Sequence, residues 1–190
     1  MNRRDVLRGG AALATGGVVT TVGLRAFSDD AAAAATDFSV AGDTVLLDDS
    51  GSVAAVWLDT TVEWAYDLPD GVQPDSVEID LLAGADESSA SVVAAHSSPE
   101  LFLEASGSQS LDAELLSAGV LSGDAIAPEA GVLETDVFVA VEFWVQSADG
   151  TRLAEAEASD LATLTVERDG YEAGDYGSVG GSGTLTINAE

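Results

Sequence analysis

The feature that most restricts the fold is a long two-residue alternation of apolar and polar side chains in residues 133–168. Successive side chains of a strand point to opposite faces, so this period predicts strands with one buried face. The turn between the two arms carries Asp149-Gly150, a pair favoured in tight hairpins. The return arm keeps its phase and is interrupted only by Asp160. We expect a β-hairpin whose buried face comprises Val137, Val139, Val141, Phe143, Val145, Ala154, Ala156, Ala158, Ala162, Leu164 and Val166.

The same period recurs in residues 53–68, where the even positions are apolar, and the length of this run predicts a bend or bulge within it. Shorter strands are expected at residues 38–40, 44–47, 76–83, 90–95, 101–104 and 184–188. Residues 110–118 favour a short helical piece that ends at Gly119. About seven to nine strands at this spacing, without alternating helices, predict an all-β fold. We expect an antiparallel β-sandwich, immunoglobulin-like or jelly-roll-like, that follows an N-terminal signal segment.

The N-terminal residues 1–35 have the features of an export signal. A basic start with Arg3, Arg4 and Leu7 precedes the apolar run 9–24 and the alanines 31–35. The paired arginines indicate the twin-arginine route, whose translocase is then the first partner of the chain. A cut is expected within residues 31–35, with Ala26 as a second position. The alternative is an uncleaved membrane anchor, although 16 apolar residues are short for a span that needs about 20.

The charge of the remaining domain, residues 36–190, restricts its solvent and its partners. Three of the 34 acidic and four of the six basic residues precede Thr36, which leaves 31 acidic residues, two arginines and a net charge of −29. Such a charge destabilises a compact chain unless salt screens it. The acidic, lysine-free composition therefore indicates a protein of a salt-loving organism. The same charge excludes nucleic acid as a partner. The absence of cysteine excludes disulfides and thiolate sites.

Few residues are candidates for site chemistry, and no cofactor is expected. His96 is the single histidine, and no Gly-x-Ser-x-Gly motif accompanies it, so we expect no catalytic triad. The Gly- and acid-rich residues 169–183 are expected to form a mobile loop. Within that loop Asp169, Glu172 and Asp175 are candidate calcium ligands, although they lack the usual spacing, and a solvated acidic loop is the alternative. Three tryptophans, together with surface carboxylates, are the candidates for a sugar-binding surface: Trp57, Trp64 and Trp144.

Two resemblances follow from these residues. The N-terminal pattern, the missing lysine and the acidic remainder resemble secreted proteins of halophilic archaea that carry twin-arginine signals. The passage from Gly23 through Ser28 into an early strand is similar to TasA/camelysin-like surface proteins, some of which assemble by donating a strand. If this domain assembles by strand donation, residues 36–47 are the expected donor, because they leave the translocase first and are flanked by alanines and glycine. The alternative is that these residues form the first strand of their own sandwich.

Together these observations lead us to expect a non-enzymatic module that is exported to the cell surface or secreted, with a structural or interaction role and a capacity for self-association or for binding another surface protein. The alternative function is an extracellular hydrolase or carbohydrate-binding domain. A concave pocket with two or more inward carboxylates and a tryptophan would favour the alternative. A flat surface with an exposed strand edge would favour the interaction module.

Overall fold

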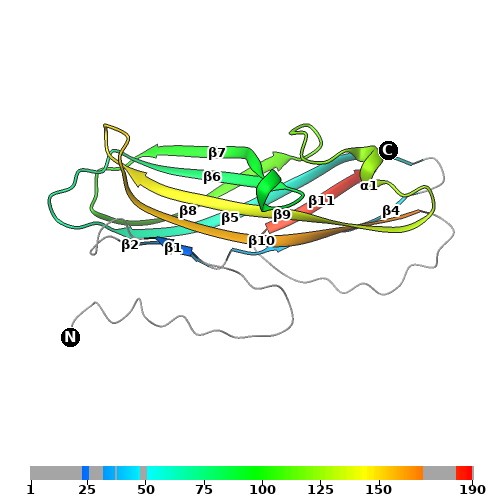
Figure 1. Ribbon diagram of the computed structural model, residues 1–190, viewed down its shortest axis with the longest axis horizontal. Coiled ribbons are helices and arrows are strands. Elements are labelled where there is room, and N and C mark those ends of the chain that lie inside the picture. The colour runs from blue at the N-terminus through cyan, green and yellow to red at the C-terminus, as the bar shows by residue number, and fades with distance from the viewer. Residues whose placement is uncertain (1–22, 26–31, 37, 48–50, 169–182, 190) are drawn as a thin grey trace, which may run out of the picture.

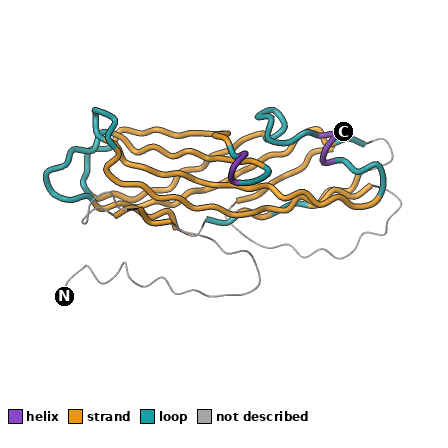
Figure 2. Tube along the Cα trace, viewed as in Figure 1, coloured by secondary structure: helices purple, strands orange, loops and turns teal. Residues whose placement is uncertain are grey.

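The computed structural model of the chain describes residues 23–25, 32–36, 38–47, 51–168 and 183–189. They form two packed β-sheets that run the length of an elongated sandwich (Figure 1). Strands make up most of the described chain, and the helical pieces η2 (Glu87–Ser89) and α1 (Gly123–Ile126) are short (Figure 2). The expected all-β sandwich is therefore confirmed. No helix in the described ranges is long and apolar enough to cross a membrane.

The first sheet has six strands, built around the predicted hairpin. Its strand order is β1 (Gly23–Arg25), β10 (Arg152–Arg168), β9 (Gly131–Gln146), β6 (Ser76–Gly84) and β7 (Ser91–Pro99), and β4 (Thr44–Leu47) pairs beside β1 on the outer edge of β10. The second sheet has five strands. In it β5 (Val53–Asp67) lies at the centre, paired with β2 (Ala32–Thr36), β11 (Gly183–Ala189) and β8 (Glu104–Glu114), and β3 (Val40–Ala41) adds to β11.

The β9–β10 hairpin pairs along its whole length, as the alternation predicts. Gly150 has φ of 83°, a left-handed conformation that glycine adopts without strain. The Asp149 carboxylate accepts hydrogen bonds from the Ser147 hydroxyl at 2.6 Å and the Thr151 amide at 3.0 Å. These donors stabilise the charged form and lower the pKa of Asp149 to about 2. The turn is thus fixed by local residues, which is why the sequence reveals it.

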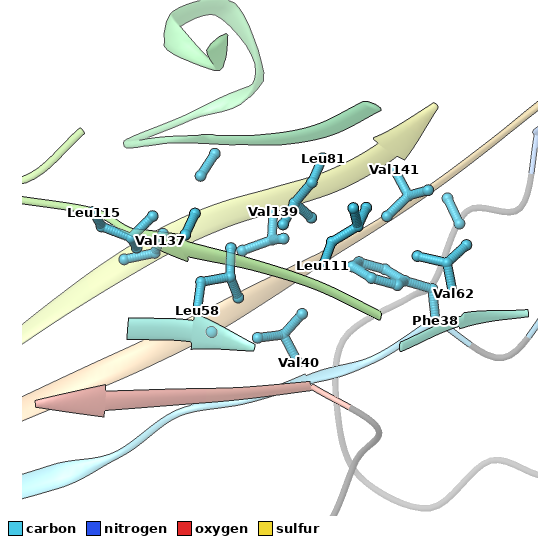
Figure 3. Packing of buried hydrophobic residues seen from close by; sticks show 14 of the residues in the cluster. Phe38, Val40, Leu58, Val62, Leu81, Leu111, Leu115, Val137, Val139 and Val141 are labelled. Atoms are coloured by element: carbon cyan, nitrogen blue, oxygen red, sulfur yellow. The ribbon is translucent and has the colours of Figure 1, made fainter. Parts of the chain in front are cut away.

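The core lies between the sheets and is built from the inward positions of both (Figure 3). Val139 and Leu81 of the first sheet approach Leu58 and Leu111 of the second, all of them buried. Aromatic rings join the layers at one place, where the Trp64 indole stacks on Phe143 with ring centroids 5.4 Å apart. Burial of these apolar faces is the main favourable term in folding, and this chain has no disulfide to add to it.

The segment 38–47 closes one side of the sandwich by pairing with both sheets of its own chain. Val40–Ala41 runs parallel to β11, and Thr44–Leu47 runs parallel to β10. Asp160, which interrupts the apolar pattern of β10, accepts a hydrogen bond from the Val40 amide at 2.9 Å. Phe38, Val40 and Leu47 are buried in the core. The structure therefore shows the segment as a strand of its own sandwich, the alternative stated above to a donor strand.

The predicted helical piece at residues 110–118 is wrong for its first half. β8 extends to Glu114 and pairs with β5 over the unbroken register Trp57–Asp67 against Glu104–Glu114. A helix-like bond appears only afterwards, from the Ala118 amide to the Glu114 carbonyl at 3.0 Å. Pairing with β5 buries Leu111 and Ala113, which a helix in this position would not do. Tertiary pairing thus overrides the local helical preference of this stretch.

Two strands also lie inside or at the border of the expected signal segment. Gly23–Arg25 pairs with Glu155–Glu157 of β10, and Ala32–Thr36 pairs with Glu63–Asp67 of β5. Arg3, Arg4 and Leu7 lie outside the described residues, so the export signal stays a prediction.

Candidate functional site

The described residues leave the calcium prediction untested and bring together no other metal or catalytic group. Asp169, Glu172 and Asp175 lie outside the described residues, so the calcium prediction is open. In the ranges that are described, no group of three or more His, Asp or Glu side chains is placed to hold a metal ion. His96 lies half-buried on β7 opposite Ile79, and no described serine or carboxylate hydrogen bonds to it. No described arrangement resembles a catalytic triad.

The three tryptophans lie in different layers of the molecule. Trp64 points into the core and stacks on Phe143 and Tyr66. Trp57 occupies an outward position of the second sheet, whereas Trp144 lies on the outer face of the first. The Arg152 guanidinium lies 4.3 Å from the centre of the Trp144 ring and covers it. A shared sugar-binding surface is therefore not formed by these side chains.

Carboxylates gather in one row on the outer face of the first sheet. Asp80, Glu142 and Glu157 are register neighbours on the adjacent strands β6, β9 and β10. Burial raises the pKa of Asp80, the charge of Glu78 raises it further, and Arg152 opposes both. Like charges directly opposite on neighbouring strands are destabilising. The row lies on the outer surface of a sheet and does not converge on an enclosed point, so it carries an electrostatic cost and no catalytic geometry.

Glu167 is the one charged side chain that is buried among the described residues. It is 2% exposed, and its Oε1 atom has no hydrogen-bond partner. Its register neighbours, Val132 on β9 and Leu46 on β4, are apolar. No second acid stands directly beside it on these strands.

The most unusual feature of the described surface is the edge formed by β8. The Leu115 amide donates to the Val56 carbonyl at 2.8 Å, and the Leu68 amide donates to the Leu103 carbonyl at 2.8 Å. Together with the register of β8 on β5, these bonds show that the amide and carbonyl groups of the odd-numbered residues of β8 point towards β5. The even-numbered groups therefore point away from the sheet. Between residues 104 and 113 they belong to Glu104, Ser106, Ser108, Ser110 and Asp112.

This edge lacks several of the features that usually prevent strands from pairing with other chains, and its charged residues Glu104, Asp112 and Glu114 lie only towards its two ends. β8 contains no lysine, no proline and no register shift over its 11 residues, and in the described chain it pairs only with β5. By contrast, the pairing of β6 with β7 carries a register shift between Leu81 and Leu82, and β7 ends at Pro99. One outward group is occupied, because the Gln109 side-chain amide donates to the Ser110 carbonyl at 2.8 Å.

Gly107 at the middle of β8 is required by the packing of the core. A Cβ atom at this position would lie 2.5 Å from Cζ2 of Trp64. The Trp64 indole, opposite Gly107 in the register, thus occupies the space that a side chain of β8 would fill. At the middle of the edge, Gly107 consequently has no side chain on the inner face of the sheet. The neighbouring serines lie on the outer face.

An apolar tip stands directly before β8. Leu101 is 78% exposed and Phe102 is 70% exposed, the two highest values among the large apolar side chains of the described residues. Their amides both donate to Oε1 of Glu100, at 2.8 and 3.0 Å, and the Tyr66 hydroxyl donates to the Phe102 carbonyl at 2.8 Å. Burial and the Glu100 charge raise the pKa of Tyr66 to about 12. These bonds hold the tip in an exposed conformation.

The sequence pattern does not predict this edge. The alternation is present in β8, where Ala105, Gly107, Gln109, Leu111 and Ala113 face inward. Only Leu111 among these five residues has a large apolar side chain, so the alternation carries little hydrophobic contrast. Comparisons with protein families, with curated proteins and with solved structures give no match to this chain.

Proposed function

We propose that the chain is a non-enzymatic interaction module, exported by the twin-arginine route to the surface or surroundings of a halophilic cell. The observation that carries this proposal is the edge of β8, which pairs with no other strand in the part of the chain that the structure describes and is uncharged along residues 105–111. An open edge of this kind binds an extended segment through main-chain hydrogen bonds. The hydrolase or carbohydrate-binding alternative gains no support from the described residues, because neither their carboxylates nor their tryptophans converge.

Substitution of Ser108 tests the edge with little disturbance of the fold. The Ser108 amide points away from β5, so Ser108→Pro removes an outward donor and leaves the β5–β8 hydrogen bonds in place. Ser108→Ala keeps that donor and is the matched control. Both variants are expressed in the native cells, which are separated into envelope and medium, and their size is measured in molar salt.

We expect wild type and Ser108→Ala to be associated with the envelope or with larger species, and Ser108→Pro to be released as a smaller species that melts at a similar temperature. Retention of Ser108→Pro in the same species as wild type would overturn the role of the edge. Hydrolysis of an extracellular polymer by the purified wild-type protein would overturn the non-enzymatic function.

A further inference from the structure

We infer that the segment bound by the β8 edge is β8 of a second copy of this chain, antiparallel to the first and related to it by a twofold axis at Gly107. This inference rests on the proposed function, since it names the partner of the same edge. Two copies of one strand can pair in this way because an antiparallel twofold contact uses the same surface on both sides. The result is one continuous sheet across two sandwiches.

The direction of the free backbone groups limits the register. Only even-numbered residues of β8 have amides and carbonyls that point outward, so hydrogen-bonded pairs must join even positions to even positions. An axis at Ser108 satisfies this condition but places Glu104 opposite Asp112 of the second copy. An axis at Gln109 places Glu104 opposite Glu114. Both oppose like charges, which is unfavourable between strands.

An axis at Gly107 avoids these oppositions. It places Ser106 opposite Ser108 of the second copy, and Glu104 opposite Ser110. Residues 105–111 of β8 carry no charge in a chain that has 34 acidic residues, so the copies approach each other along an uncharged stretch. Of the three registers compared, this is the only one in which no acidic side chain of β8 faces another.

The geometry at the axis also fits. Gly107 would face Gly107 of the second copy in a non-hydrogen-bonded pair, the closer of the two antiparallel pair types, with Cα atoms about 4.5 Å apart. Glycine suits this approach because it brings no side chain to the contact. In the same register Phe102 falls opposite Asp112 and Leu101 opposite Ala113 of the second copy. The exposed apolar tip is thereby brought beside the end of the partner strand.

The chain has no cysteine, so pairs of introduced thiols report the register directly. Ser106→Cys and Ser108→Cys are prepared separately and oxidised mildly in molar salt, alone and as an equimolar mixture. Opposed strand residues have Cα separations of about 5.5 Å in hydrogen-bonded pairs, which is within the range that a disulfide spans. We expect the mixture to form at least tenfold more covalent dimer than either variant alone.

Two results would overturn the inference. Efficient crosslinking of Ser108→Cys alone would place the axis at Ser108 and contradict the Gly107 register. Absence of crosslinking in the mixture, with wild type sedimenting as a monomer at high concentration in molar salt, would contradict pairing of two copies. In that case, release of Ser108→Pro from the envelope would still support an interaction module with a different partner. A dimer that forms equally well in wild type and Ser108→Pro would instead contradict the role of the β8 edge in the proposed function.

Discussion

At the scale of the residue, Gly107 joins the core to the open edge. Its lack of a side chain makes room for the Trp64 indole, which in turn stacks on Phe143 of the opposite sheet. The absence of a Cβ atom at Gly107 therefore makes room for the aromatic cluster, and it also leaves the middle of β8 without an inward side chain.

Gly107→Ala is expected to lower the free energy of unfolding by about 1–3 kcal/mol, since the new Cβ overlaps an indole that is fixed by its stacking partners. Thermal unfolding in molar salt, at a concentration where the chain is monomeric, measures the change. Ser108→Ala, on the outward side of the same strand, should be close to neutral. Equal melting temperatures for the two variants would contradict the packing role of Gly107.

Tyr66 gives the stability a dependence on alkaline pH. Its pKa is raised from 10.0 in the unfolded chain to about 12 in the folded protein. The folded state therefore keeps a proton that the unfolded state loses, so this contribution is complete below pH 10 and disappears between pH 10 and about 12. Tyr66→Phe should remove the dependence, which unfolding measurements from pH 8 to 12 would detect. A wild-type stability profile that matches the variant over this range would contradict the assignment.

At the scale of the element, the local sequence pattern is sufficient to predict most strands but not which strands pair with one another. The β9–β10 hairpin was predictable because its apolar side chains are large, its period is two and its turn is fixed by Asp149 and Gly150. β8 was only partly predictable, because Gly107 and Gln109 carry no hydrophobic signal and the stretch from Ser110 onward favours a helix locally. What decides β8 is its pairing with β5, a contact between residues about 50 positions apart. The candidate edge depends on that pairing and could not be inferred from the sequence.

The segment 38–47 depends on another close contact. A Cβ atom at Gly42 would overlap the Thr163 carbonyl oxygen of β10, which is backbone and cannot move aside easily. Gly42→Ala should therefore displace the segment, break the 2.9 Å bond from the Thr165 amide to the Asp43 carbonyl, and cost about 1–3 kcal/mol. Amide exchange at Thr165 and thermal unfolding measure the two effects. The exposed neighbour Thr44→Ala is the control, and unchanged exchange at Thr165 in Gly42→Ala would contradict the contact.

At the scale of the whole molecule, the negative charge is expected to make the stability of the fold depend on the salt concentration. Asp80, Glu142 and Glu157 place like charges in adjacent register positions of the first sheet. Residues 36–190 contain 31 acidic residues and two arginines and therefore carry a net charge of −29. Screening extends over about 10 Å at 0.1 M salt and about 3 Å at 1 M.

Dialysis of the purified domain from molar salt to about 0.1 M should consequently unfold it, because repulsion between carboxylates is no longer screened at short range. Circular dichroism should show loss of the sheet signal, and return of the signal on restoring salt is the control for aggregation. A cooperative thermal transition that is unchanged in low salt would show that the proposed adaptation to salt is incorrect.

The proposed export concerns the whole precursor. Replacing Arg3 and Arg4 with lysine should retain the precursor inside the cell, because the paired guanidinium groups are the feature that the twin-arginine translocase is expected to recognise. Immunoblots of cells and medium measure the distribution. Replacing Arg8 alone with lysine is the control, and secretion of the double variant at the wild-type level would contradict the route.

The parallel pairing of β3 with β11 has a mechanical consequence. If one end of the chain is held and the other is pulled, parallel neighbours slide lengthwise past each other, so their hydrogen bonds are loaded together and not one at a time. Val40–Ala41 and Gly183–Ala189 have this arrangement, and the first lies near the N-terminus while the second lies near the C-terminus. In the domain 36–190, which would begin just before β3, tension along the chain would thus act first on a shear contact. The rate of forced unfolding, and not the equilibrium stability, would determine how long the sandwich survives under load.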